Sequence, residues 1–510
     1  MPAPVMQDSR DRSRRRNWLF RVAAMAIPFL LFAGFEGVCH VAGWGAPQLA
    51  DDPFVGFTAV HPLFEHRPLE RRWRIAPARR PFFADDSFAD PKPADGFRIF
   101  CLGGSTVQGR PWSVPTAFTT WLRLALQQAE PTRQWEVVNC GGVSYASYRL
   151  VPILTEVLRH QPDLIILCTG HNEFLEDRTY AHIKEPHRLL TEGYDFAREW
   201  RSYQLVRRLM NGPANGAIDL EQRPILSIET DPILDYHDSL AAYHWDDGWQ
   251  AGVEAHFEFN VARMVELAND AEVPLVLMRP CSNLADCPPF KSEHPEPLTA
   301  EQLARWESAR SAALAAVSTD LTETLRQLTI AAAFDPYYAG VLYDIGKCEQ
   351  ALGRPAEARR WLVRARDCDV CPLRMTSSLE AALDRVAERT GTPVIDLQSL
   401  LEAPTPERLL GAAQLVDHIH PTFEGHQAVS KAVLRAMEQA GLVTPTDGWE
   451  TRTEEVWRNH LASLDIHYFA RGRRQLDSLR GWAAGRADGP PAAERFPWRV
   501  FPAPTESAEP

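Results

Sequence analysis

A serine that follows an early apolar segment and an Asp–His pair near the other end of the chain could together carry out nucleophilic chemistry. Residues 97–102 form an apolar run that leads directly into Gly103-Gly104-Ser105-Thr106. More than 300 residues later the chain contains Asp417-His418-Ile419-His420-Pro421. A nucleophilic hydroxyl needs a base that accepts its proton, and the base needs a carboxylate that orients it. These residues would supply all three parts if the fold brings them together.

The elements that must position these residues follow an alternating pattern of strands and helices. The predicted strands are short apolar runs at 97–103, 135–140, 164–169, 274–279 and 392–397. The predicted amphipathic helices lie near 117–128, 147–160, 252–268 and 424–440. This alternation predicts an α/β fold with a parallel sheet that is covered on both faces. In such sheets chemistry collects beyond the carboxyl ends of the strands, where Ser105, Ser144 and Asn172 all lie.

Four stretches, in this order, resemble the sequence blocks of the SGNH/GDSL hydrolase superfamily. Gly103-Gly104-Ser105-Thr106 is similar to its Gly-Asp-Ser block, with glycine in place of Asp, and Gly170-His171-Asn172-Glu173 is similar to its Gly-x-Asn-Asp block, with Glu in place of the last Asp. Asp417-His418-Ile419-His420-Pro421 matches its Asp-x-x-His-Pro block. The block that normally supplies a glycine amide falls within residues 139–144. Ser144 takes the glycine position there, with Gly142 nearby.

The resemblance covers about 97–180 and 273–440, and it implies a three-layer α/β/α sandwich around a five-stranded parallel, flavodoxin-like sheet. It implies that Ser105 is the nucleophile, His420 the general base and Asp417 the carboxylate that orients the imidazole. The implied oxyanion donors are the backbone N–H of Ser105, an N–H at Gly142 or Ser144, and the side chain of Asn172. The implied reaction is ester cleavage or acyl transfer through an acyl-serine intermediate, without a metal or another cofactor.

Each of these residues also has a structural interpretation. Ser105 could cap the helix that follows it, and Asn172 could be an ordinary turn residue. His420 could be a loop histidine with a backbone partner. No Gly-x-Ser-x-Gly elbow surrounds Ser105, which disfavours the α/β-hydrolase fold.

Other histidines and cysteines raise the question of metal binding or disulfides. His171, His418 and His426 accompany His420, but their spacing matches no zinc motif, so we expect no metal site. The pairs Cys281/Cys287 and Cys368/Cys371 could form disulfides in an oxidising compartment.

Two basic residues near the predicted site are candidates for binding an anionic part of the substrate. Lys291 lies in a Pro-rich loop beyond the fourth predicted strand, and Arg374 follows the Cys-x-x-Cys motif. The alternative for both is simple solvation at the surface.

The N-terminus predicts a membrane anchor. Residues 1–17 form a basic tail, residues 18–44 are mostly apolar, and residues 22–35 carry no charge. Their length and the preceding arginines predict a single transmembrane helix, with a cytoplasmic N-terminus and a catalytic domain on the periplasmic or extracytoplasmic side. A cleaved signal peptide is the alternative.

The rest of the chain divides by composition. We expect a linker that packs onto the body at 45–96, the hydrolase domain at 97–445, and a C-terminal extension at 446–510 whose end is disordered. Within the domain we expect an irregular insertion at 180–250 and a helical insertion at 300–390. The latter contains a tetratricopeptide-like hairpin at 338–369, which could bind a protein partner.

The predicted function is therefore that of a serine esterase or O-acyltransferase, with acetyl groups on cell-envelope or secreted carbohydrate as the first substrate expectation. The net charge of −13 argues against a nucleic-acid partner. The competing hypothesis is a catalytically inactive envelope scaffold or binding protein that uses the tetratricopeptide-like helices. A lipase acting on the membrane would need an apolar lid, and the acid-rich residues 180–250 do not resemble one.

Overall fold

A parallel sheet lies at the centre of the larger of two units into which the chain folds. The computed structural model describes residues 27, 32–39, 42, 55–57, 61–176, 202, 225–226, 239–405, 407–486 and 496–499. One unit consists of residues 1–58 and 178–227, and the other of residues 59–177 and 228–510.

The central sheet has five strands, all at the predicted places. They are β5 (Gly96–Gly103), β6 (Gln134–Gly141), β7 (Leu164–Cys168), β9 (Leu275–Arg279) and β10 (Val394–Asp396). Their order is β10-β9-β7-β5-β6, and all neighbours are parallel. The flavodoxin-like order that we predicted is therefore confirmed. Because Gly103 pairs with both Gly141 and Cys168, three strands end at the same edge.

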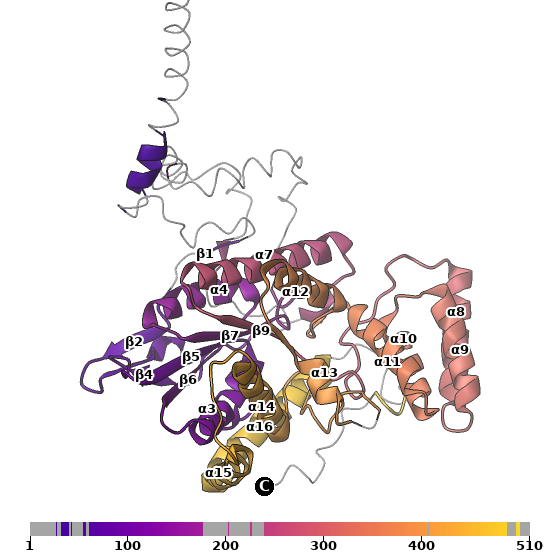
Figure 1. The fold of residues 1–510 in the computed structure, drawn as a ribbon. Coiled ribbons are helices and arrows are strands. Elements are labelled where there is room, and N and C mark those ends of the chain that lie inside the picture. Colours follow the sequence, from indigo (N-terminus) through magenta and orange to yellow (C-terminus); the bar gives the residue numbers. More distant parts are fainter. Residues whose placement is uncertain are drawn as a thin grey trace, which may run out of the picture. The chain divides into compact units, whose positions relative to one another are not determined.

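Helices cover both faces of this sheet (Figure 1). One layer contains α4 (Ser147–Val157), α7 (Asp247–Asp270) and α12 (Ser377–Thr390), with α7 packed against the other two. The other contains α3 (Phe118–Ala129), α13 (Leu397–Glu402), α14 (Phe423–Gln439) and α15 (Trp449–Ser463). In the second layer α3 packs against α14 and α15. Apolar side chains of Ile99, Trp121 and Val433 meet in the core between the sheet and these helices. Burial on both faces explains why the strands are continuous apolar runs.

The segment at 45–96 contains more structure than a linker. Strands β2 (Phe64–Arg67), β3 (Arg72–Ile75) and β4 (Ser87–Ala89) form a three-stranded antiparallel sheet. Phe88 packs edge-on against Phe100 of the central sheet, with ring centroids 5.2 Å apart. Arg98 of β5 donates to Glu136 at 2.7 Å and to the carbonyl of Ala89 at 2.8 Å, which ties the small sheet to the central one.

Five helices occupy the region expected to be a helical insertion. Before α12 these are α8 (Ala300–Ala316), α9 (Leu321–Phe334), α10 (Ala339–Ala351) and α11 (Pro355–Asp367). The pairs α8–α9 and α10–α11 pack together, and α10–α11 coincides with the predicted hairpin at 338–369. Its relation to tetratricopeptide repeats stays a prediction.

The C-terminal segment contacts both the domain around the central sheet and the helical region at 300–390. Helix α16 (Ile466–Arg486) follows α15. Near the C-terminus Phe496 joins the core of the helical region, and Trp498 and Arg499 donate to the buried carboxylate of Asp344 at 2.9 and 2.5 Å. The end that we expected to be disordered lies outside the described residues.

Little of the smaller unit is described. Residues 32–39 are helical, and Glu36 accepts a hydrogen bond from the backbone N–H of Ser202 at 2.8 Å. Strand β1 (Gly56–Phe57) pairs in parallel with β8 (Ile225–Leu226). The predicted basic tail at 1–17 and most of the predicted anchor at 18–44 lie outside the described residues, as does most of the predicted insertion at 180–250. Within the described part of the chain, no helix has both the length and the apolar character needed to cross a membrane.

Candidate active site

Ser105 sits where the chain leaves the central strand β5 and turns into a short helix, α2 (Ser105–Gln108). Two glycines allow this tight turn. A Cβ on Gly103 would lie 2.2 Å from the carbonyl oxygen of Cys168, and a Cβ on Gly104 would lie 2.5 Å from the amide nitrogen of Asn172. Glycine at position 104 therefore lets Asn172 approach the backbone just before Ser105.

The hydroxyl of Ser105, the imidazole of His420 and the carboxylate of Asp417 form one chain of hydrogen bonds. Ser105 Oγ is 2.8 Å from His420 Nε2, and His420 Nδ1 is 2.6 Å from Asp417 Oδ2. All three residues are buried, with 5 to 8% of their surface exposed. Because a carboxylate only accepts hydrogen bonds, Nδ1 carries the proton and Nε2 is left to accept from the serine hydroxyl. The proximity expected from the sequence is thus found in the structure.

Asp417 is held in its ionised form. Burial by itself would raise its pKa, but the charge and hydrogen bond of His420 and two backbone donors outweigh burial, so the pKa of Asp417 is lowered below its usual value. The backbone donors are the N–H groups of Ile419 and His420, at 2.9 and 2.8 Å from Oδ1.

The loop that carries Asp417 and His420 is fixed by neighbours on both sides. Asn283, just after β9, donates its backbone N–H to the carbonyl of His418 at 2.9 Å and its side-chain amide to the carbonyl of Asp417 at 3.2 Å. Arg480 on α16 donates to the carbonyl of Val416 at 2.8 and 3.0 Å. Neither Asn283 nor Arg480 was predicted from the sequence to belong to the site. Because Asn283 follows a predicted strand, its position in the sequence indicates a place at this edge of the sheet. No sequence pattern indicates a role for Arg480.

Hydrogen bonding distinguishes between the two predicted backbone donors that follow β6. The N–H of Gly142 donates to Gly103 at 2.9 Å, and the N–H of Val143 donates to Phe82 at 2.9 Å. Among the described residues, the N–H of Ser144 has no acceptor. Ser144 adopts a φ of 61°, in the left-handed region that favours glycine.

The other two predicted donors lie at the same edge of the sheet. The N–H of Ser105 belongs to the first residue of α2 and therefore has no partner within that helix. Asn172 donates one side-chain hydrogen to the carbonyl of Tyr145 at 3.0 Å, which leaves its second amide hydrogen for another acceptor.

Glu173 fixes the loop that bears Asn172. It is 1% exposed, and its carboxylate accepts from the N–H and the hydroxyl of Ser147 at 2.9 and 2.8 Å. Ser147 is the first residue of α4, so the carboxylate satisfies a donor at the positive end of that helix.

Three further histidines near His420 are buried and neutral. Burial, followed by the charge of neighbouring groups, lowers the pKa of His171, His418 and His426 to about 3. His171 Nδ1 accepts from the N–H of Met375 at 3.1 Å, and His418 stacks on Phe290 with ring centroids 4.3 Å apart. Among the residues that the structure describes, no group of three His, Cys, Asp or Glu side chains is arranged to hold a metal ion.

The two basic candidates for substrate binding already have partners within the protein. Lys291 Nζ donates to the carbonyls of Leu240, at 3.1 Å, and Tyr243. Arg374 donates to the carbonyls of Asn283 and Cys287 at 3.0 and 2.9 Å. Arg374 is only 2% exposed, so solvation at the surface is the wrong explanation for it.

All nine cysteines are free thiols, and neither of the two expected pairs is bonded. Cys281, Cys287 and Cys371 are buried. Burial raises the pKa of Cys281 to about 12 and that of Cys287 well above its usual value, so both stay protonated.

Comparisons with known proteins find only solved structures of low similarity to this chain. No family model and no curated protein sequence matches the chain. Among solved structures, it is similar to a lipase/acylhydrolase from Enterococcus faecalis, with 13% identity, 69% of this chain and 100% of that chain covered, and a TM-score of 0.31. The acetylxylan esterase Axe2 from Geobacillus stearothermophilus has 14% identity, 68% and 94% coverage, and a TM-score of 0.27. A GDSL-like lipase from Bacteroides thetaiotaomicron has 12% identity, 69% and 93% coverage, and a TM-score of 0.29. Because these values are low, the function proposed below depends on the geometry of the site itself.

Proposed function

We propose that this protein is a serine esterase or O-acyltransferase of the SGNH/GDSL type, which carries the acyl group of its substrate on Ser105. The observation that supports this most directly is the continuous hydrogen-bonded chain from Ser105 through His420 to Asp417. A serine that only capped a helix would not need a buried imidazole and carboxylate aligned behind its hydroxyl.

In the first half of the reaction, Ser105 Oγ attacks the ester carbonyl carbon while His420 Nε2 takes the hydroxyl proton. The carbonyl oxygen gains negative charge, which the N–H groups of Ser105 and Ser144 and the amide of Asn172 stabilise. One such donor typically contributes about 3 kcal/mol to lowering the barrier. His420 then gives its proton to the leaving alkoxide oxygen, the carbon–oxygen bond breaks, and the acyl group stays on Ser105.

In the second half, a hydroxyl attacks the acyl-serine and His420 removes its proton. Water releases the free acid, whereas a sugar hydroxyl accepts the acyl group as a new ester. His420 returns the proton to Ser105 Oγ. Throughout, Asp417 keeps the proton of His420 on Nδ1 and stabilises the imidazolium form.

The substrate we propose is an acylated carbohydrate of the cell envelope or a secreted polysaccharide, with acetyl as the acyl group. The N-terminal sequence supports this location, because an arginine-rich tail precedes an apolar stretch long enough to anchor an exported protein. Protease treatment of spheroplasts that contain the full-length protein tests it. Digestion of the body without lysis supports export, and protection of the body contradicts it.

Covalent labelling with a fluorophosphonate tests the proposed chemistry. We expect the full-length wild-type protein and a Ser318→Ala control, altered at an exposed turn, to be labelled. We expect Ser105→Ala to lose the label. Failure to label folded wild-type protein would instead favour the inactive scaffold. A series of p-nitrophenyl esters of rising chain length, with and without added acceptor sugar, then identifies the acyl group and separates hydrolysis from transfer.

A further inference from the structure

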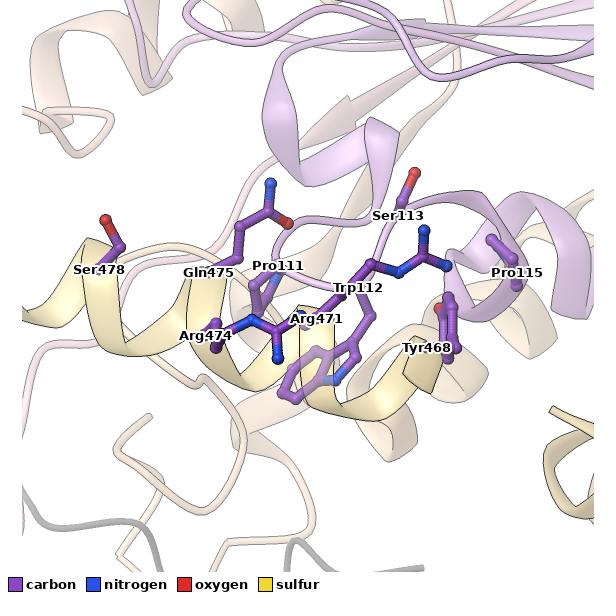
Figure 2. A pocket seen from close by; sticks show the side chains of 10 residues that line it. Pro111, Trp112, Ser113, Pro115, Tyr468, Arg471, Arg474, Gln475 and Ser478 are labelled. Carbon is purple, nitrogen blue, oxygen red and sulfur yellow. The ribbon is translucent and has the colours of Figure 1, made fainter. Parts of the chain in front are cut away.

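A hollow beside the proposed catalytic residues has a composition that the proposed chemistry does not explain. Its volume is about 580 Å³, and it lies between the loop after α2 and helix α16, two segments more than 350 residues apart. Figure 2 shows Trp112 of the loop lying against the helix that carries Tyr468, Arg471, Arg474 and Gln475.

The hollow carries positive charge. Arg471 and Arg474 are exposed, and neither guanidinium makes a hydrogen bond or ion pair with any other described residue. No Asp or Glu lines the hollow, and the single carboxylate of α16, Asp477, is not among its lining residues. In a chain with a net charge of −13, two unpaired guanidinium groups on one concave surface indicate a site for an anion.

The walls of the hollow are built by close contacts. A Cβ on Gly472 would lie 1.9 Å from Trp112 Cδ1, so the indole rests directly on the backbone of α16. The indole also contacts Phe423, with ring centroids 4.7 Å apart. Tyr468 is fixed by a hydrogen bond of 2.7 Å between its hydroxyl and that of Thr116. The shape is therefore formed before any ligand enters.

The hollow lies next to both halves of the proposed active site. The N–H of Arg110 is hydrogen bonded to the carbonyl of Ser105 at 3.1 Å, and Trp112 is two residues further along the chain. Phe423, which contacts the Trp112 ring, follows His420 by three residues. Short stretches of chain therefore connect the walls of the hollow to both Ser105 and His420.

We propose that this hollow is a subsite for an anionic group of the substrate, a carboxylate or a phosphate, bound by Arg471 and Arg474. The inference rests on the proposed function and narrows its substrate class to acylated anionic saccharides, such as polymers that contain uronic acids. A planar guanidinium group can donate two parallel N–H hydrogen bonds to two oxygens of a carboxylate or a phosphate.

A kinetic comparison tests the subsite in the full-length protein. We would measure kcat/KM for an acetylated oligogalacturonate and for an acetylated xylo-oligosaccharide, which is neutral. In Arg471→Gln, in Arg474→Gln and in the double variant, the ratio of the anionic to the neutral value should fall about tenfold or more, the effect of losing one charge-assisted contact. Arg458→Gln removes an exposed, unpaired arginine of α15 outside the hollow and should leave both the ratio and the activity unchanged. A ratio that stays the same in the double variant overturns the proposal.

A binding experiment separates failure of the subsite from failure of the proposed esterase. We would titrate full-length Ser105→Ala with unacetylated hexagalacturonate and with inorganic phosphate, following the heat of binding. An affinity for either probe that falls at least tenfold when Arg471 and Arg474 are replaced supports the subsite, and the probe that binds identifies the anion. This result would stand even if the wild-type protein cleaved no ester. Absence of binding to both probes, or binding that does not depend on the two arginines, overturns the subsite whether or not esters are cleaved.

Discussion

The hydroxyl oxygen of Ser105 lies 2.8 Å from Nε2 of His420, although 315 positions separate the two residues in the chain. Such a contact is a product of the sheet topology, since both residues lie beyond the carboxyl ends of parallel strands. Its chemical value depends on which ring nitrogen carries the proton, and Asp417 determines this.

Asp417→Asn should lower kcat by about 10³- to 10⁴-fold. The oxygen of the new amide is expected to accept the hydrogen bonds from the backbone N–H groups of Ile419 and His420. Its NH₂ group then faces Nδ1 of His420. The imidazole proton must then move to Nε2. A protonated Nε2 can no longer accept the proton of Ser105. Steady-state kinetics with p-nitrophenyl acetate measure the loss. The exposed Asp447→Asn serves as the control, and a fall of less than tenfold in a folded Asp417→Asn protein would contradict the assigned role.

Asn172→Ala should lower kcat by about 10²- to 10³-fold and change KM little, because the lost hydrogen bond is made to charge that develops only in the transition state. The measurement is the separate determination of kcat and KM for a short-chain ester. Asn459→Ala on the exposed face of α15 is the matched control. A rise in KM with unchanged kcat would show that Asn172 binds the substrate uniformly and does not stabilise an oxyanion.

Ser144→Gly should raise the free energy of unfolding by up to about 1 kcal/mol. The φ of 61° at Ser144 costs a residue with a side chain about 1–2 kcal/mol, and the larger chain entropy of glycine in the unfolded state cancels part of this gain. Urea denaturation gives the difference. Ser318→Gly, at a turn with negative φ, should show no gain. A destabilised Ser144→Gly protein would mean that the serine side chain stabilises the turn.

His426→Leu should stabilise the protein more at pH 5 than at pH 7. Both ring nitrogens of the buried His426 have no hydrogen-bond partner among the described residues, and burial lowers its pKa from 6.5 to about 3. Between these values the unfolded chain binds a proton that the folded chain does not. Above about pH 6.5 His426 is neutral in both states, so its titration does not reduce the free energy of unfolding. As the pH falls below that value, protonation of the unfolded chain lowers the free energy of unfolding.

At pH 5 the free energy of unfolding is lowered by about 2 kcal/mol through this titration, and the leucine variant, which has no group that titrates here, is not affected. The difference in unfolding free energy between variant and wild type should thus be about 2 kcal/mol larger at pH 5 than at pH 7. Urea denaturation at the two pH values measures it, with the exposed His61→Leu as the control. An equal difference at both pH values would show that His426 titrates alike in the folded and unfolded chain.

The central sheet could be predicted from the sequence because its strands are buried on both faces, and such strands are uninterrupted apolar runs. The small sheet β2–β4 could not. Its strands have only three or four residues, and the segment Arg72–Ile75 has two arginines among them. The start of α7 was also placed too late, because the capping bond from Trp249 to Asp246 lies in a polar stretch that shows no helical periodicity.

For the site, the sequence predicted the placement of Ser105, Asn172, Asp417 and His420 but left the choice between Gly142 and Ser144 open. That choice depends on hydrogen bonds to Gly103 and Phe82, and Phe82 belongs to a segment we expected to be a linker. The long side chains of Lys291 and Arg374 were harder to interpret, because their partners are carbonyl groups from distant loops that sequence alone does not bring together.

The contact of Arg480 with the carbonyl of Val416 has a consequence for biosynthesis. A nascent chain that ends before this arginine contains the serine, the histidine and the aspartate, but it lacks the guanidinium that holds the loop bearing the last two. Synthesis must therefore proceed through α16 before this support forms. Translation products truncated ahead of α16 would accordingly carry every residue of the hydrogen-bonded chain and still lack one of the two supports of the loop that bears the imidazole.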